Sequence, residues 1–361
     1  MCRRFAAVAL LAVLLALPAA ASKRRAAGQP RPFPPCSMVT GTGAVTFTHD
    51  EGRTLAPTSE PLRGIVYTYG LVALPGEENT LMAWHGDDLL LSTDAGCSWR
   101  VAATITGWDF PPKLAAAGNG RVYGWSDNRR FLIRYDGRGV KSLKQPADFV
   151  GFAVDPNDGD HLRAGGGDGV IWESRDAGET WDPLGRIDAT DEVLYRFTFD
   201  PHDLDHIVAG MTRKGAFVTR DGGKSWTRAT GLGKGNVNAF QFEISPADSN
   251  YVYAMAIDLA TTGRHIYLSR DGGLTYDPVV TEEPGIKLVN GPTMAAHPAN
   301  RDVLYFVFGT ATQGYGTDLM RFDLATRQVT ITHSDYHDIA AIAFSPKDAR
   351  VMYLGLVNEA H

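Results

Sequence analysis

One short turn motif, Ser/Thr-x-Asp-x-Gly-x-x-Trp/Tyr, recurs along this chain and constrains its fold more than any other feature. In such a turn a carboxylate accepts backbone N–H bonds, a hydroxyl closes a local hydrogen bond, and glycine supplies a positive φ. These local bonds satisfy the carboxylates, so we expect a structural role for them rather than a catalytic or metal-binding one. Four strong copies and one weaker, N-terminal copy hold Asp50, Asp94, Asp176, Asp221 and Asp271.

The residues around each motif indicate short antiparallel strands. Apolar or alternating runs such as 89–91 and 265–268 flank the motif, which places it at the tip of a β-hairpin. A second, proline-containing turn lies upstream, as at Pro156 and Pro201, and another strand follows it. Each repeat therefore contains strands A, B, C and D, with the proline turn between A and B and the Asp box between C and D. This is the pattern of a β-propeller blade.

The repeat count and the two chain ends predict a closed ring. Asp136 and Asp323 hold the aspartate position in two further, degenerate turns, which makes seven repeats. The last repeat has the proline turn at Pro346 but ends before a box, whereas the box at Asp50 has no A or B strand before it. We therefore predict an all-β, seven-bladed propeller over residues 44–361, closed by N-terminal strands C and D pairing with C-terminal strands A and B. Closure leaves no lone sheet edge.

With these boxes, residues 44–361 resemble the Asp-box (BNR, sialidase-like) repeat propellers. That superfamily includes sialidases, xyloglucan-degrading endoglucanases, sortilin ectodomains and a photosystem II assembly and stability factor. The resemblance implies the propeller fold and a structural role for the boxes. It does not fix an activity, because one fold hosts many functions.

The N-terminus has the pattern of an export signal. Arg3 and Arg4 precede an apolar run over 5–17 and small residues at 19–21, so residues 1–21 are predicted to be a signal peptide and the protein to be secreted or periplasmic. An uncleaved anchor is the alternative; after cleavage no membrane span is expected. Residues 22–43 are expected to form a proline-rich leader.

The cysteines indicate a disulfide, and the charge indicates which classes of partner are excluded. Cleavage would leave Cys36 and Cys97 of the three cysteines, and an oxidising compartment favours a disulfide between them at the closure seam. The formal net charge is −6 with no basic run, which argues against a nucleic-acid partner. His202 and His206 fall in a proline turn, and the run 231–235 lacks the Ser/Thr and following helix of a phosphate cradle. No cofactor and no metal are expected.

A binding site is expected on the side of the ring opposite the boxes, where the B–C and D–A loops converge near the central channel. We call this side the loop face. Aromatic rings there can stack on sugars or pack on a protein, and arginines can grip carboxylates. The candidates are Trp108, Asp109, Trp125, Arg129, Arg130, Arg213, Arg264, Tyr315, Tyr336 and His337.

A complete fold signature without a catalytic signature favours a non-catalytic, monomeric binding or assembly module for an extracytoplasmic protein or carbohydrate. In this respect the chain is most like the photosystem factor and the sortilins. The alternative is a sialidase-like glycoside hydrolase, which would need an arginine cluster, a tyrosine nucleophile with its glutamate, and an aspartic acid. The chain supplies these residue types but lacks the Arg-Ile-Pro segment of the sialidases; Arg63-Gly-Ile does not match it.

Overall fold

The computed structural model describes most of the chain beyond the predicted signal segment. The described residues are 33–59, 62, 66–108, 110, 112–127, 129–188, 192–233, 235–261, 263–309, 316–335 and 338–358. They belong to one compact unit, which begins at Phe33. This part of the chain contains no apolar helix of membrane-crossing length.

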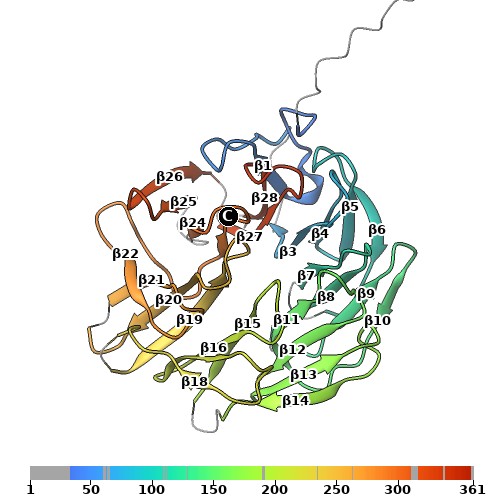
Figure 1. Ribbon diagram of the computed structural model, residues 1–361. Coiled ribbons are helices and arrows are strands. Elements are labelled where there is room, and N and C mark those ends of the chain that lie inside the picture. Colours follow the sequence, from blue (N-terminus) through green and yellow to red (C-terminus); the bar gives the residue numbers. More distant parts are fainter. Residues whose placement is uncertain are drawn as a thin grey trace, which may run out of the picture. The chain divides into compact units, whose positions relative to one another are not determined.

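Seven four-stranded antiparallel sheets form the blades of a ring, and the predicted seven-bladed propeller is confirmed (Figure 1). Blade 1 holds β3 (Gly70–Ala73), β4 (Leu81–His85), β5 (Asp88–Ser92) and β6 (Arg100–Thr104). Blade 2 holds β7 (Lys113–Ala116), β8 (Val122–Trp125), β9 (Leu132–Tyr135) and β10 (Val140–Ser142). Blade 3 holds β11 (Phe149–Val154), β12 (Leu162–Gly166), β13 (Val170–Ser174) and β14 (Asp182–Arg186).

The next three blades are built in the same order. Blade 4 holds β15 (Leu194–Phe199), β16 (Ile207–Met211), β17 (Gly215–Thr219) and β18 (Thr227–Arg228). Blade 5 holds β19 (Val237–Ile244), β20 (Val252–Asp258), β21 (Gly263–Ser269) and β22 (Asp277–Thr281). Blade 6 holds β23 (Met294–Ala296), β24 (Val303–Gly309), β25 (Thr317–Asp323) and β26 (Gln328–Ser334). Blade 7 holds β27 (Asp338–Phe344), β28 (Met352–Asn358), β1 (Val45–Thr48) and β2 (Val66–Tyr67), and a 3₁₀ turn, η1 (Gly41–Gly43), precedes β1.

Blade 7 joins the two ends of the chain, as predicted. β28 pairs with β27 on one edge and with β1 on the other, where Val45 lies opposite Gly355 (Figure 1, blue beside red). The outer position is irregular: residues 55–58 run along β1, with the Ala56 N–H donating to Phe47 O at 2.8 Å. The short strand β2 pairs instead with the end of β28, beyond β1. The seam therefore contains a regular strand C and a strand D reduced to a few contacts.

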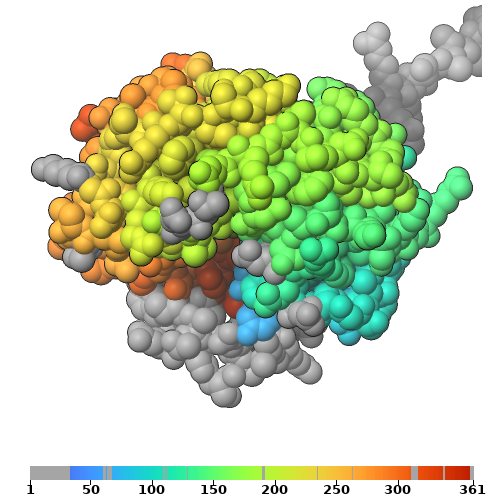
Figure 2. All heavy atoms as spheres, turned by 90° about the horizontal axis from the view of Figure 1, so that it is seen from below, coloured from blue at the N-terminus to red at the C-terminus, as the bar shows by residue number. Residues whose placement is uncertain are grey.

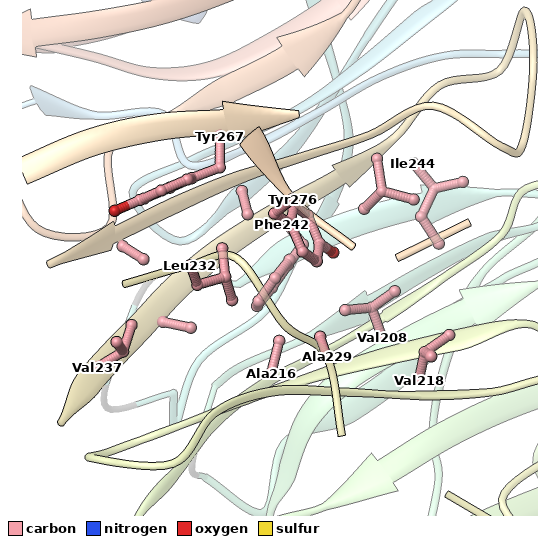
Figure 3. Close-up of a cluster of buried hydrophobic side chains, with 14 residues drawn as sticks. Val208, Ala216, Val218, Ala229, Leu232, Val237, Phe242, Ile244, Tyr267 and Tyr276 are labelled. Atoms are coloured by element: carbon pink, nitrogen blue, oxygen red, sulfur yellow. The ribbon is translucent and has the colours of Figure 1, made fainter. Parts of the chain in front are cut away.

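Buried side chains between adjacent blades form the core. Between blades 4 and 5, Val208 and Val218 pack against Phe242, Ile244 and Tyr267 (Figure 3). All five are at most 4% exposed. Blades stand side by side around the rim of the ring, from green through yellow to orange (Figure 2). The middle strands are covered by a neighbouring blade on both faces, which explains their nearly continuous apolar runs.

The innermost strands approach one another so closely that glycine is required. A Cβ on Gly151 of β11 would lie 2.3 Å from the carbonyl oxygen of Phe197 in β15, and a Cβ on Gly70 of β3 would lie 2.6 Å from Pro112 O. Both distances are far below a van der Waals contact. These glycines allow seven inner strands to surround a narrow channel.

Cys36 and Cys97 form a disulfide with a Cα–Cα distance of 5.9 Å, the pair expected from the sequence. It ties the segment before β1 to the box turn of blade 1. Val39 in this segment is 1% exposed and bridges to Thr58. The expected start of the propeller at residue 44 therefore falls inside the folded unit, because the last part of the predicted leader packs against blades 1 and 7.

Candidate functional site

The Asp boxes have the geometry of self-contained turns. In blade 3, Asp176 accepts the Ser174 hydroxyl at 2.9 Å, the Thr180 N–H at 2.9 Å and the Thr180 hydroxyl at 2.6 Å. The Gly178 N–H in turn donates to the Ser174 hydroxyl at 2.9 Å. Hydrogen bonds from Thr180 hold the pKa of Asp176 below its usual range. Both carboxylate oxygens are thus used within the turn.

The other four boxes repeat this pattern. In each, the carboxylate accepts the hydroxyl of the Ser or Thr two residues earlier and of the Ser or Thr four residues later; the carboxylates are Asp50, Asp94, Asp221 and Asp271. No group of His, Cys, Asp and Glu suited to a metal ion occurs among the described residues. The boxes therefore belong to the scaffold, at the ends of the C strands.

His202 and His206 take separate structural contacts in the proline turn of blade 4. The ring of His206 is fully buried, with Nδ1 2.8 Å from Asp200 Oδ2 and Nε2 2.8 Å from Gly272 O in the box of blade 5. The Nε2 atom of His202 lies 2.8 Å from Pro246 O. Both rings link blade 4 to blade 5 and do not face one common point.

The candidate arginines of the loop face are held at separate places. Arg130 Nε lies 3.3 Å from Asp148 Oδ1, and Arg213 Nε donates to Glu192 Oε1 at 3.1 Å. Arg264 Nε donates to Asn290 Oδ1 at 2.9 Å, and its Nη1 lies 3.8 Å from Glu282 Oε2. Arg129 is exposed in the loop between β8 and β9. Each paired arginine uses an acceptor of its own, so these side chains do not converge on one anion site.

The candidate tryptophans contribute to packing. Trp108 Nε1 donates to Asp87 Oδ1 at 2.9 Å, and its ring lies edge-on to Trp84 at 6.3 Å. Trp125 is 6% exposed, because the end of β8 turns it into the core beside blade 3, where little of the ring is available for stacking. The remaining candidates lie outside the described residues: Asp109, Tyr315, Tyr336 and His337.

An aromatic row on the loop face was not singled out from the sequence. Tyr67 stacks on Tyr69 at 6.2 Å, and Tyr69 lies 5.8 Å from Phe110, which is 46% exposed. We call these three residues the aromatic row. Val193 and Leu259, in loops on the same face, are 61% and 39% exposed. No local pattern marks the row, because its residues come from the closing blade and the starts of blades 1 and 2.

A charged cluster lies at the inner strands. Lys113, the first residue of β7, bonds to Asp127 Oδ2, and Arg196 Nη2 of β15 lies 3.4 Å from the same oxygen. Blades 2 and 4 are not neighbours, so these contacts pass in front of blade 3, inside the central channel. On β19, Gln241 Nε2 donates to Glu243 Oε1 at 3.2 Å. We call these five residues the channel cluster.

Burial brings the pKa values of two members of the channel cluster close to 7. It raises the pKa of Glu243 to about 7. Burial, with the nearby Arg196 guanidinium, lowers the pKa of Lys113 to about 8. Asp127 Oδ1 is buried and has no hydrogen-bond partner within the described part of the chain. The channel cluster thus contains a buried acid with a raised pKa and a buried amine with a lowered one.

Solved structures match the ring. A GH74 xyloglucanase from Xanthomonas campestris is 16% identical, with a TM-score of 0.60 over 81% of this chain and 51% of that chain. This chain thus spans about half the length of that enzyme. YCF48 from Cyanidioschyzon merolae is 11% identical, with a TM-score of 0.58 over 81% of this chain and 96% of that one. A structure of YCF48 bound to D1 peptide gives a TM-score of 0.58 at 10% identity, over 82% of this chain and 94% of that one. At these identities the likeness concerns the fold alone.

Sequence comparisons are more specific. Residues 169–282, from β13 to β22, match the family described as sortilin, neurotensin receptor 3. This match confirms the predicted relation to Asp-box propellers. The YCF48 structures show the same fold. The dispase autolysis-inducing protein of Streptomyces mobaraensis is 46% identical over 335 residues, which cover 90% of this chain and 89% of that protein. The chain therefore belongs to the family of the dispase autolysis-inducing protein.

Proposed function

We propose that this protein is an exported, non-catalytic binding module that engages a protease through its loop face and promotes the autolysis of that protease. The observation that carries the proposal is the 46% identity, over 90% of the chain, to a protein named for inducing autolysis of dispase. The export pattern of residues 1–21 supports a site of action outside the cytoplasm.

The loop face offers the chemistry of a protein-binding surface. The aromatic row presents Phe110 at 46% exposure, beside two tyrosines fixed by ring contacts. Aromatic side chains supply much of the binding energy at protein interfaces, because they bury a large area at little cost in conformational entropy. Val193 and Leu259 add exposed apolar surface on the same face.

Contacts of the loop-face arginines favour binding over glycoside hydrolysis. A sialidase-type site needs arginines that converge on one substrate carboxylate, whereas Arg130, Arg213 and Arg264 each lie beside a carboxylate in a different place. The box aspartates are used within their own turns. Among the described residues, no contact supports the hydrolase alternative.

Promotion of autolysis follows from binding alone. A protease cleaves itself where a segment opens transiently, and a partner that binds the opened form more tightly raises the population of that form. A tenfold difference in affinity corresponds to about 1.4 kcal/mol, which is enough to increase the open population about tenfold. The module then needs no catalytic group of its own.

The test follows dispase fragmentation by gel electrophoresis and mass spectrometry, with and without the purified protein. We expect faster self-cleavage with the wild type, and weaker binding and slower cleavage with Tyr69→Ala and Phe110→Ala. Leu274→Ala is the matched control, because Leu274 is a 40% exposed apolar side chain in the box turn of blade 5. An unchanged fragmentation rate together with hydrolysis of fluorogenic glycosides would overturn the proposal.

A further inference from the structure

We infer that the buried ring of His206 is held as an imidazolium ion and acts as a pH-sensitive latch between blades 4 and 5, independently of protease binding. The residue is 0% exposed and lies where the proline turn of blade 4 meets the box of blade 5. Each ring nitrogen lies 2.8 Å from an oxygen, Nδ1 from Asp200 Oδ2 and Nε2 from Gly272 O. One acceptor therefore belongs to blade 4 and the other to blade 5.

Both partners of the ring only accept hydrogen bonds. A backbone carbonyl oxygen has no proton to donate. Burial raises the pKa of Asp200, but hydrogen bonds from the His206 ring and the Ser249 hydroxyl bring it below its usual range, so this side chain is a carboxylate. A neutral imidazole has one N–H and one lone pair, and that lone pair would face an oxygen in either tautomer. The imidazolium ion donates from both nitrogens, so the contacts fit the charged ring.

The repeats of the proline turn support this pairing. The turns of blades 3 and 4 begin with Asp155 and Asp200, and each has a histidine six residues later, His161 and His206. The turns of blades 5 and 7 begin with serine and have a tyrosine or a valine at that place. The His161 ring also lies between two carboxylates, with Nδ1 3.0 Å from Asp155 Oδ2 and Nε2 3.0 Å from Glu173 Oε1, but both belong to blade 3. His206 instead reaches the neighbouring blade.

Other charged groups near the latch have contacts of their own. On the two proline turns and the two boxes that meet there, these groups are His202, Asp203, Asp205, Asp248, Arg220, Asp221 and Asp271. The box aspartates are used within their turns, and Asp205 Oδ1 lies 2.9 Å from Arg163 Nη2. The Arg220 guanidinium lies against Gly272 and opposes a positive ring, but Arg220 is exposed and its charge is screened. The buried carboxylate of Asp200 touches the ring directly and outweighs it.

Loss of the second ring proton would weaken the contact between the two blades. One ring nitrogen would then present a lone pair to a buried oxygen, which costs free energy because both groups are left unsatisfied. Strand β16 begins directly after His206 and places Val208 in the core shared by the two blades (Figure 3). The charged ring therefore stabilises the fold at acidic pH. That stabilisation is lost as pH rises above about 6.5, the usual value for histidine in an unfolded chain.

Nitrogen NMR of the protein with labelled histidine tests the charge of the ring. At pH 7.5 the spectra distinguish an imidazolium, in which both nitrogens carry protons, from either neutral tautomer. We expect His206 to keep both protons at this pH. Loss of the signal in His206→Gln identifies it, and slow exchange of its protons with solvent, expected of a fully buried ring, is a second identification. A neutral ring would overturn the inference.

Urea unfolding at several pH values tests the latch itself. In the wild type, the proton on His206 should lower the folding equilibrium constant by up to about tenfold for each pH unit above about 6.5. Asp200→Asn should remove this part of the pH dependence, because the new amide donates to a neutral ring while its oxygen still accepts the His202 N–H. His202→Gln removes another histidine of the same turn and is the matched control, which should keep the wild-type dependence. The same pH dependence in Asp200→Asn and the wild type would refute the latch.

Discussion

Removing the disulfide should weaken the seam of the ring before any other part. Cys36 and Cys97 are 61 residues apart in sequence, and in the chain-entropy description a closed loop of that length stabilises the native state by about 4 kcal/mol at 25 °C. The loop encloses β1, the strand that the N-terminus contributes to blade 7. The double variant Cys36→Ser, Cys97→Ser should therefore lose up to about 4 kcal/mol of unfolding free energy.

Guanidinium unfolding measures this loss, and hydrogen exchange with mass spectrometry locates it. We expect faster exchange first in β1 and in its partner β28, while blade 4 on the far side keeps its protection. The wild type treated with a reductant is the control and should match the double variant. A loss below about 1 kcal/mol, or exchange that rises first in blade 4, would refute the reasoning.

Three further substitutions test the scaffold and the channel. Asp176→Ala should lower the free energy of unfolding by about 1–2 kcal/mol at pH 7, because three hydrogen bonds are lost at an exposed turn. Since the pKa of Asp176 is lowered in the folded state, the difference from the wild type should shrink on acidification to pH 3. An equal loss at both pH values in denaturant unfolding would contradict this. The pKa of Glu243 is about 7, above its value in the unfolded chain, so the stability that its neutral form contributes is lost as pH rises toward 7. Glu243→Gln should therefore be more stable relative to the wild type at pH 8 than at pH 5. Identical dependence of the unfolding free energy on pH in the two proteins would contradict this. Gly151→Ala should lower the free energy of unfolding by about 1–3 kcal/mol, because the new Cβ would collide with Phe197 O. Gly139→Ala is the control: its new Cβ has open space, so it should be nearly neutral in the same unfolding assay. Equal losses would contradict the close approach of the inner strands.

Sequence patterns predicted the scaffold because each blade is a local unit. Five Asp boxes and the proline turns indicated where one strand ends and the next begins. The incomplete repeats at Asp50 and Pro346 predicted that both ends of the chain share blade 7. The irregular D position over 55–58 was not predicted, because its contacts depend on packing against β1 and not on strand periodicity. Prolines suggested an extended leader; the disulfide expected from the sequence ties its last part to the ring, and the burial of Val39 there was not predicted.

The sequence indicated which residue types line the loop face, but not which of these residues contact one another. Trp125 was predicted to lie in a loop between strands B and C, yet it ends β8 and faces the core. The channel cluster joins Lys113, Arg196 and Glu243 from three blades, and no sequence spacing encodes which loops and inner strands meet across a ring. The aromatic row was missed because it crosses the closing seam.

Amide hydrogen exchange of the protein, alone and with an inactivated dispase, tests the proposed binding face most directly. We expect slower exchange in the complex at residues 66–70 and 107–110, around the aromatic row, and no change in the box turns at 92–99 and 174–181. Protection of the box turns with no change near Tyr69 and Phe110 would contradict a role for the loop face in binding the protease.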